Sequence, residues 1–85
     1  LISANLSEAN LVSAKLSGAN FSGANLNEAN LHSAKLRGTK LRGTKLRGAN
    51  LGNIQWNENT VWPSPEEVAQ AEIIPEALKQ QLGIE

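Results

Sequence analysis

Apolar residues recur along the chain with a period of five. Leucine, replaced once by Phe21, stands at every fifth position from Leu1 to Leu51, and alanine or threonine stands two positions before it. An α-helix cannot use this period, because five steps of about 100° leave successive leucines about 140° apart around the axis. A straight strand cannot use it either, since an odd spacing places successive leucines on opposite faces. The pattern therefore predicts a chain that turns a corner once per unit and directs each leucine and its small neighbour inward.

A longer period of twenty emerges when the chain is aligned with itself. Residues 6–16, LSEANLVSAKL, match residues 26–36, LNEANLHSAKL, at nine of eleven positions. Twenty residues are four units, so four corners close one turn and the coil has four sides. Stacked at the inter-strand spacing of about 4.8 Å, the repeats would form nearly three turns with a height of about 14 Å.

The unit Ala-Asn/Lys-Leu-x-x, repeated over residues 1–56, resembles the pentapeptide-repeat proteins, a family abundant in cyanobacteria. The resemblance implies an all-β solenoid: a right-handed quadrilateral β-helix with four units per coil, whose leucine and alanine face the interior. It also implies a cyanobacterial-type protein. The sequence departs from the pattern at Thr39 and Thr44, whose inward hydroxyl groups need hydrogen-bond partners. It departs again at Ile54 and Trp56, where regular coiling is expected to end.

Glycine occupies the last position of about half the units and predicts corners with positive φ, as type II turns require. Glu8 and Glu28 stand in the same position of other units. We therefore expect that the corners are not all of one type.

Residues 57–85 read as a C-terminal capping segment on the solenoid of residues 1–56. Ser64, Pro65 and Glu67 predict a capping box with proline in the first helical position, and hence a helix near 65–71. A second short helix is expected from Pro75, with Gly83 as its stop. The predicted lid over the last coil consists of apolar side chains, namely Trp56, Trp62, Val68, Ile73, Ile74, Leu78 and Leu82.

No comparable cap precedes Leu1, although the ends of a solenoid expose unpaired edges. We expect the natural protein to continue upstream, which makes this chain the C-terminal part of a longer protein. The alternative is association of two molecules through their uncapped N-terminal ends.

The zero net charge hides two unlike halves. Residues 1–56 carry seven Lys or Arg against two Glu, and residues 57–85 carry six Glu against Lys79. Six of the basic residues flank three successive leucines and wrap around three sides of the coil as a basic collar, which consists of Lys35, Arg37, Lys40, Arg42, Lys45 and Arg47. The collar either binds a polyanion, with an affinity that falls with salt, or is neutralised by the acidic cap.

The sequence offers little for catalysis, and we expect that the protein is not an enzyme and has no catalytic, cofactor or metal site. Cysteine is absent, and His32 is the only histidine, stacked by the register of twenty between Val12 and Gly52. No apolar run is long enough for a membrane span. The default expectation is a soluble, cytoplasmic protein, although an upstream targeting signal would not be visible.

These features favour a non-catalytic structural or protein-interaction module that docks an unidentified protein partner. Its outward ladders, such as Asn10/Asn30/Asn50 and Asn5/Asn25/Lys45, would form the rigid docking surface. The alternative is a polyanion- or nucleic-acid-binding protein that uses the basic collar. Nucleic acid is the less favoured ligand, because no exposed aromatic side chains are expected for base stacking.

Overall fold

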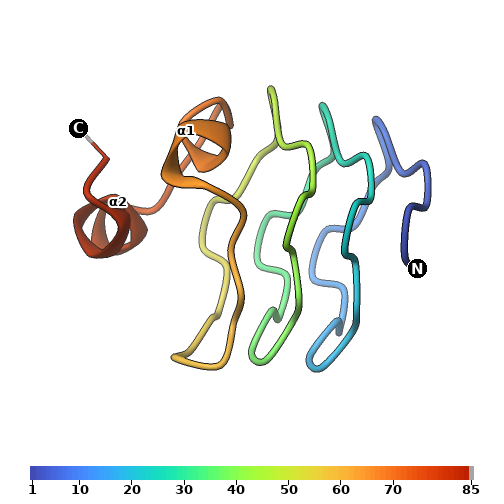
Figure 1. Ribbon diagram of the computed structural model, residues 1–85, viewed down its shortest axis with the longest axis horizontal. Helices are drawn as coiled ribbons and strands as arrows, with labels where there is room; N and C mark the ends of the chain where they lie inside the picture. The colour runs from blue at the N-terminus through green and yellow to red at the C-terminus, as the bar shows by residue number, and fades with distance from the viewer. Residues whose placement is uncertain (85) are drawn as a thin grey trace.

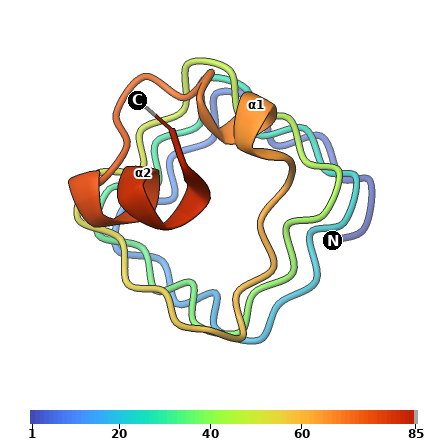
Figure 2. The ribbon, with the colours of Figure 1, turned by 60° about the vertical axis from the view of Figure 1, so that its left-hand side comes forward.

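The computed structural model describes residues 1–84 and shows a stack of coils closed at one end by two short helices (Figure 1). Neighbouring coils are joined by parallel β-bridges between residues twenty apart, such as Asn5 with Asn25 and Asn30 with Asn50. This is the register that the self-alignment predicts, and it makes the chain a β-solenoid. Viewed along the stack, successive coils follow one another around a common ring, with both helices at the same end (Figure 2).

The extended segments of the coil are too short to count as strands. Within residues 1–84 the pairing consists of isolated bridges. Each unit closes a turn, in which the alanine N–H donates to the carbonyl oxygen of the leucine three residues earlier, as Ala24 does to Phe21 at 2.9 Å. A four-residue turn in a five-residue unit leaves little chain to pair with the next coil. The expected all-β solenoid is therefore built from turns and single bridges.

The corners of the solenoid share one backbone conformation. From Ser3 to Asn53, the third residue of every turn has a positive φ, including the two glutamates, Glu8 and Glu28, at 63° each. The expectation of more than one type of corner is therefore wrong in this respect. The physical reason is stacking: each corner from Ser3 to Ser33 donates its N–H to the corner of the next coil, as Glu28 does to the Arg47 carbonyl oxygen at 2.8 Å. A residue other than glycine accepts this conformation at a cost of about 1–2 kcal/mol.

Asparagine before the leucine braces the turn that follows. Its Oδ1 accepts the N–H of the residue two positions later, as Asn20 does from Ser22 at 3.0 Å and Asn50 does from Gly52 at 2.8 Å. Such local bonds are the usual reason for asparagine in turns. Lysine cannot accept a hydrogen bond, so the units with lysine at this position lack the brace.

Leucine, alanine and threonine fill the interior of the second and third coils. The leucines from Leu26 to Leu51 are at most 2% exposed. Thr39 and Thr44 are buried beside them, and their hydroxyl groups donate to the carbonyl oxygens of Leu16 and Leu41, each at 2.8 Å. The predicted need for partners at these two threonines is met by the backbone.

The first coil is the open end of the stack. Leu1 and Ile2 are each 65% exposed, and the other inward leucines of this coil are only half-buried. Its backbone is also short of partners. The Asn30 N–H donates to the Ala9 carbonyl oxygen at 2.9 Å, whereas the equivalent Asn10 N–H has no acceptor within residues 1–84. Within residues 1–84, the first coil therefore exposes apolar core residues and unpaired edge groups.

The last coil contains one extra residue. A turn over residues 57–60 shifts the pairing, so that Lys40 bridges to Val61 at a spacing of twenty-one. Thr60 takes the inward place of alanine, and its Oγ1 donates to the Leu36 carbonyl oxygen at 2.7 Å. Regular spacing therefore ends near residue 56, while irregular pairing continues beyond it.

Helix α1 (Pro65–Val68) forms the first part of the lid and is shorter than the predicted helix over 65–71. The chain leaves it to pair again with the last coil, where the Gln70 carbonyl oxygen accepts the Gly48 N–H at 3.0 Å. Only half of the predicted capping box forms. The Ser64 Oγ accepts the Glu67 N–H at 3.3 Å, but the Glu67 side chain turns to the solenoid.

Helix α2 (Glu76–Leu82) completes the lid and ends, as predicted, at Gly83 with φ of 74°. Val68 and Leu78 are fully buried against the core. Ile73 is 45% exposed, contrary to its predicted place in the lid, because its backbone forms the last bridge, with Asn50. Neither helix within residues 1–84 has the length and apolar character needed to span a membrane.

Candidate functional site

The basic collar lies on the outside of the second and third coils. All six of its side chains, Lys35, Arg37, Lys40, Arg42, Lys45 and Arg47, are exposed, which agrees with the outward direction that the five-residue pattern predicts. Each Lys-Leu-Arg triplet holds the leucine in the core and places its two cations on the surface. The collar therefore consists of three Lys/Arg pairs on three successive sides of the coil.

The three pairs have different neighbours along the ladders. Lys35 bridges to Lys15 in the preceding coil and to Gln55 in the following one. Lys40 bridges to Asn20 and Val61. Lys45 bridges to Asn25, but no bridge joins it to the segment after the third coil within residues 1–84, because α1 replaces the coil there. The cap thus meets the collar most directly at the third pair.

Glu67 is the cap residue that makes this contact. Its Oε2 accepts the Leu46 N–H at 2.9 Å. In every earlier unit from Leu6 to Leu41, the leucine N–H donates to a backbone carbonyl oxygen of the next coil. Glu67 also lines a shallow depression of about 150 Å³ together with Lys45 and Arg47. A side-chain carboxylate therefore continues the ladder where the backbone no longer can, and it lies beside the third basic pair.

The second and third pairs sit in identical pentapeptides, Thr-Lys-Leu-Arg-Gly at 39–43 and at 44–48. In the later unit, the Arg47 N–H donates to Asn27 Oδ1 at 2.9 Å and the Gly48 N–H donates to the Gln70 carbonyl oxygen. In the earlier unit, the Arg42 and Gly43 N–H groups have no acceptor within residues 1–84. The same five residues are thus satisfied by the protein in one place and left with free donors in the other.

A shallow depression of about 140 Å³ adjoins the earlier unit. Ser22, Lys40, Arg42 and Val61 line it, so its wall is basic and lacks a carboxylate. The Ser22 hydroxyl donates to Asn20 Oδ1 at 2.7 Å and is therefore already engaged. The charged donors of this depression are the two collar side chains.

Acidic residues are unevenly placed around the two identical units. A Cβ added at Gly48 would collide with the Glu28 carboxylate, which shows that Glu28 leans over the later unit. The equivalent contact of Gly43 is the backbone of Gly23. Glu28 and Glu67 thus both lie at the later unit.

The remaining polar candidates do not form a catalytic cluster in the described chain. His32 is exposed, and a Cβ at Gly52 would come within 3.0 Å of its Nδ1, as expected from the predicted column. Within residues 1–84 no three His, Asp or Glu side chains gather as metal ligands do.

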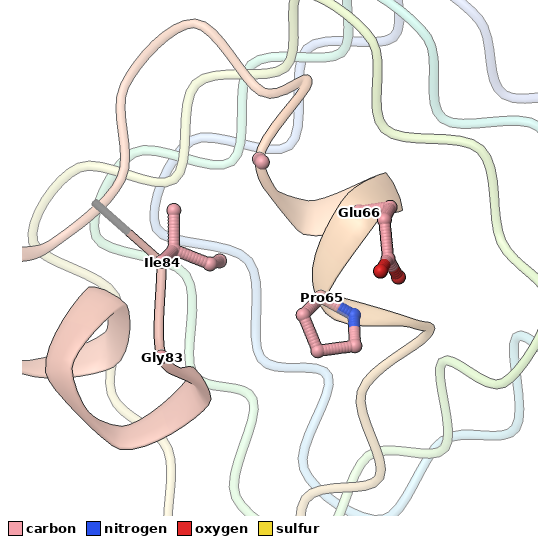
Figure 3. A pocket seen from close by; sticks show the side chains of 5 residues that line it. Pro65, Glu66, Gly83 and Ile84 are labelled. Carbon is pink, nitrogen blue, oxygen red and sulfur yellow. The ribbon is translucent and has the colours of Figure 1, made fainter.

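A third depression, of about 340 Å³, lies between α1 and the C-terminal turn. Pro65, Glu66, Ala69, Gly83 and Ile84 line it, and the Ile84 side chain points toward α1 (Figure 3). It is formed by the cap alone, and no collar residue lines it.

Sequence reasoning missed two features of this surface. It assigned Glu67 to a capping box, although that carboxylate bonds to the solenoid. It also treated the collar as uniform, although the repeated TKLRG sequence already allowed a comparison of two identical units in different surroundings.

The fold and the repeat define a β-solenoid of five-residue units, and the match to a known family agrees. The family of pentapeptide repeats matches residues 4–43 as eight copies. The chain is similar to a solved pentapeptide repeat protein, Rfr23 from the cyanobacterium Cyanothece 51142, at 46% identity and a TM-score of 0.41; the match covers 73% of this chain and 46% of that one. It is also similar to alr5209, a pentapeptide repeat protein from Nostoc Pcc 7120, at 30% identity and a TM-score of 0.27, over 71% and 66% of the two chains.

The chain therefore spans about half the length of Rfr23 and about two thirds of alr5209. No match was found among the curated proteins. With its repeats at residues 4–43, the chain belongs to the pentapeptide-repeat family, which confirms the resemblance drawn from the Ala-Asn-Leu units.

Proposed function

We propose that this chain is a non-catalytic docking module, a right-handed, four-sided coil of the cyanobacterial type that presents its outward ladders to a protein partner. The supporting observation is the division of roles between the two sides of the wall. Leucine, alanine and threonine fill the inside, while the bridge positions carry exposed polar side chains in register, such as Asn10, Asn30 and Lys35. A ladder fixed by backbone hydrogen bonds holds its side chains at low entropic cost, which favours docking.

Variants of one ladder test this role. Asn10→Asp and Asn30→Asp keep the Oδ acceptor that braces each turn while they change the charge of one side. The equivalent control is Asn20→Asp, which alters a different side and also keeps its brace. The immobilised module would be used to capture partners from cyanobacterial extract, and each captured protein would be repurified and titrated against the variants. Docking predicts that one ladder variant weakens binding and the other does not. Equal binding to all variants, or no purified partner that binds, would contradict it.

A second candidate is a polyanion binder that uses the basic collar. The observation in its favour is that all six collar side chains are exposed. Among the cap glutamates, Glu67 shares a depression with collar residues, namely Lys45 and Arg47. The aromatic side chains weaken nucleic acid as the ligand, because Phe21 is buried and Trp56 and Trp62 are half-buried against the core.

Fluorescence anisotropy with a labelled oligonucleotide at two salt concentrations tests this candidate. Each phosphate contact should add about −0.7 to the slope of log K against log salt for a single strand. The absence of binding at low salt would refute a polyanion role and leave the docking proposal intact.

A further inference from the structure

The solenoid already holds one oxyanion on a Lys-Leu-Arg triplet. The Glu67 carboxylate bonds to the Leu46 N–H at 2.9 Å and shares a depression with Lys45 and Arg47. The triplet thus holds a carboxylate through a backbone N–H, with a lysine and an arginine lining the same depression. A hydrogen bond from a backbone N–H to an ionised carboxylate is among the stronger hydrogen bonds of proteins.

The identical triplet one unit earlier has the cations without the carboxylate. Its depression is lined by Ser22, Lys40, Arg42 and Val61, and the acidic neighbours Glu28 and Glu67 lie at the later unit. Lys40 and Arg42 therefore line a depression without a carboxylate, whereas Lys45 and Arg47 share theirs with Glu67. A pair of uncompensated cations around a small hollow attracts an anion.

The two units also differ in their backbone N–H groups. The Leu41 N–H is bonded to the Val61 carbonyl oxygen at 2.7 Å, so it is not available to a ligand. The next two N–H groups, those of Arg42 and Gly43, have no acceptor within residues 1–84. Arg42 lines the depression and Gly43 follows it in the chain, so these two amides are suited to report an anion bound there.

We propose that Lys40 and Arg42 form a binding site for a phosphate group. Arginine and lysine are the side chains that bind phosphate most often, arginine through its planar fork and lysine as a point charge. The hollow of about 140 Å³ has room for a small tetrahedral anion, since one water occupies about 30 Å³ in the liquid. The site is open to solvent, so it accepts either free phosphate or a phosphate that belongs to a longer molecule.

This site sharpens the second candidate function and is independent of protein docking. If the collar acts as a whole, then all three pairs contribute alike. If the position of the Glu67 carboxylate determines phosphate binding, then the second pair binds phosphate and the third does not. The two identical pentapeptides make this difference measurable, because each serves as the control for the other.

The experiment is an amide-resolved NMR titration of the full chain with inorganic phosphate, against sodium chloride at the same ionic strength. Three proteins are compared: the unaltered chain, Lys40→Ala/Arg42→Ala, and Lys45→Ala/Arg47→Ala. All four side chains are exposed, and retention of the wild-type amide spectrum away from the substitutions shows that each variant is folded. We expect saturable shifts of the Arg42 and Gly43 amides in the unaltered chain, weakened at least about tenfold in the first variant and unchanged in the second.

A parallel titration with oligothymidylate identifies the source of the phosphate. Shifts of Arg42 and Gly43 with inorganic phosphate support a site for free phosphate, and shifts with oligothymidylate alone support a site for a phosphodiester chain. Three results would overturn the proposal: no saturable shift with either probe, binding that survives in the Lys40/Arg42 variant, or an equal response at Arg47 and Gly48. Salt-dependent binding that persists in the Lys40/Arg42 variant would refute this site and leave a collar-wide polyanion role standing.

Discussion

Glu67 should stabilise the attachment of the cap through its bond to the solenoid. Its carboxylate replaces a backbone carbonyl as the acceptor of the Leu46 N–H at 2.9 Å. Glu67→Ala removes this acceptor at the end of a ladder where the neighbouring Leu46 side chain is 0% exposed. Leaving a buried donor unpaired costs about 1–3 kcal/mol. The side chain of Glu67 is itself half-buried, so water compensates in part and the lower half of this range is expected.

The neighbouring Glu66 provides the matched control. Both glutamates stand in the first turn of α1, where a negative charge stabilises the helix by about 0.3–1 kcal/mol. Glu66 is exposed and has no hydrogen bond to the solenoid within residues 1–84. Glu66→Ala therefore measures the effect of the helix charge, and the difference between the two variants measures the bond to Leu46. Glu67→Gln, which keeps an acceptor oxygen but loses the charge, should fall between them.

Urea denaturation is the appropriate assay, with unchanged m-values as the sign that the folded state is retained. For a domain of this size, each kcal/mol also lowers the melting temperature by about 4–8 °C. Hydrogen exchange of the Leu46 amide gives a local measurement, which should accelerate in Glu67→Ala and not in Glu66→Ala. Equal destabilisation by both alanine variants, or an unaltered Leu46 amide, would show that the carboxylate does not continue the ladder.

Three further predictions concern the repeats. Thr44→Val should destabilise by about 0.5–1.5 kcal/mol in urea denaturation, because the hydroxyl donates to a backbone carbonyl inside the coil; equal stability would show that this bond is dispensable. Gly18→Ala should cost about 1–2 kcal/mol through its positive φ alone, and Gly48→Ala should cost more, since the carboxylate of the neighbouring coil occupies the space of its Cβ; equal losses would contradict that reasoning. Leu26→Ala, at a site 1% exposed, should cost about 2–5 kcal/mol and clearly more than Leu6→Ala in the half-buried first coil, and the reverse order would refute the burial gradient.

The register of the fold could be predicted from the sequence because it is written into the repeat itself. Residues 6–16 match residues 26–36 at an offset of twenty, and the bridges between coils have the same offset, as between Asn10 and Asn30. The two helices of the cap could also be predicted approximately, because the start signal at Ser64 and the stop signal at Gly83 act on neighbouring residues. Local chemistry and strict periodicity are what a sequence states directly.

The contacts that could not be predicted join residues far apart without a repeat. Glu67 lies in a good capping-box position, and its local sequence gives no sign that Leu46 is the better donor. The extra residue before Val61 was also not predicted, and it shifts the last bridge of Lys40 by one position. The positive φ at Glu8 and Glu28 was underestimated because their own preference points the other way, and stacking between coils overrides it.

The same difference explains why the collar looked uniform. Its three Lys-Leu-Arg triplets have the same sequence, and they differ only in their surroundings, because the cap and Glu28 lie beside one of them. Which cation pair is free for a ligand is therefore a property of the tertiary structure.

The bridges between successive coils also set the mechanical behaviour of the molecule. Apart from the turn within each unit, backbone bonds in the solenoid run only between neighbouring coils, so a force applied at the half-buried first coil loads one row of bonds at a time. A chain pulled from that end should unravel in steps of one coil, and each twenty-residue coil would release about 70 Å of extended chain. Unfolding under force should therefore show repeated extensions of one fixed length, one for each coil.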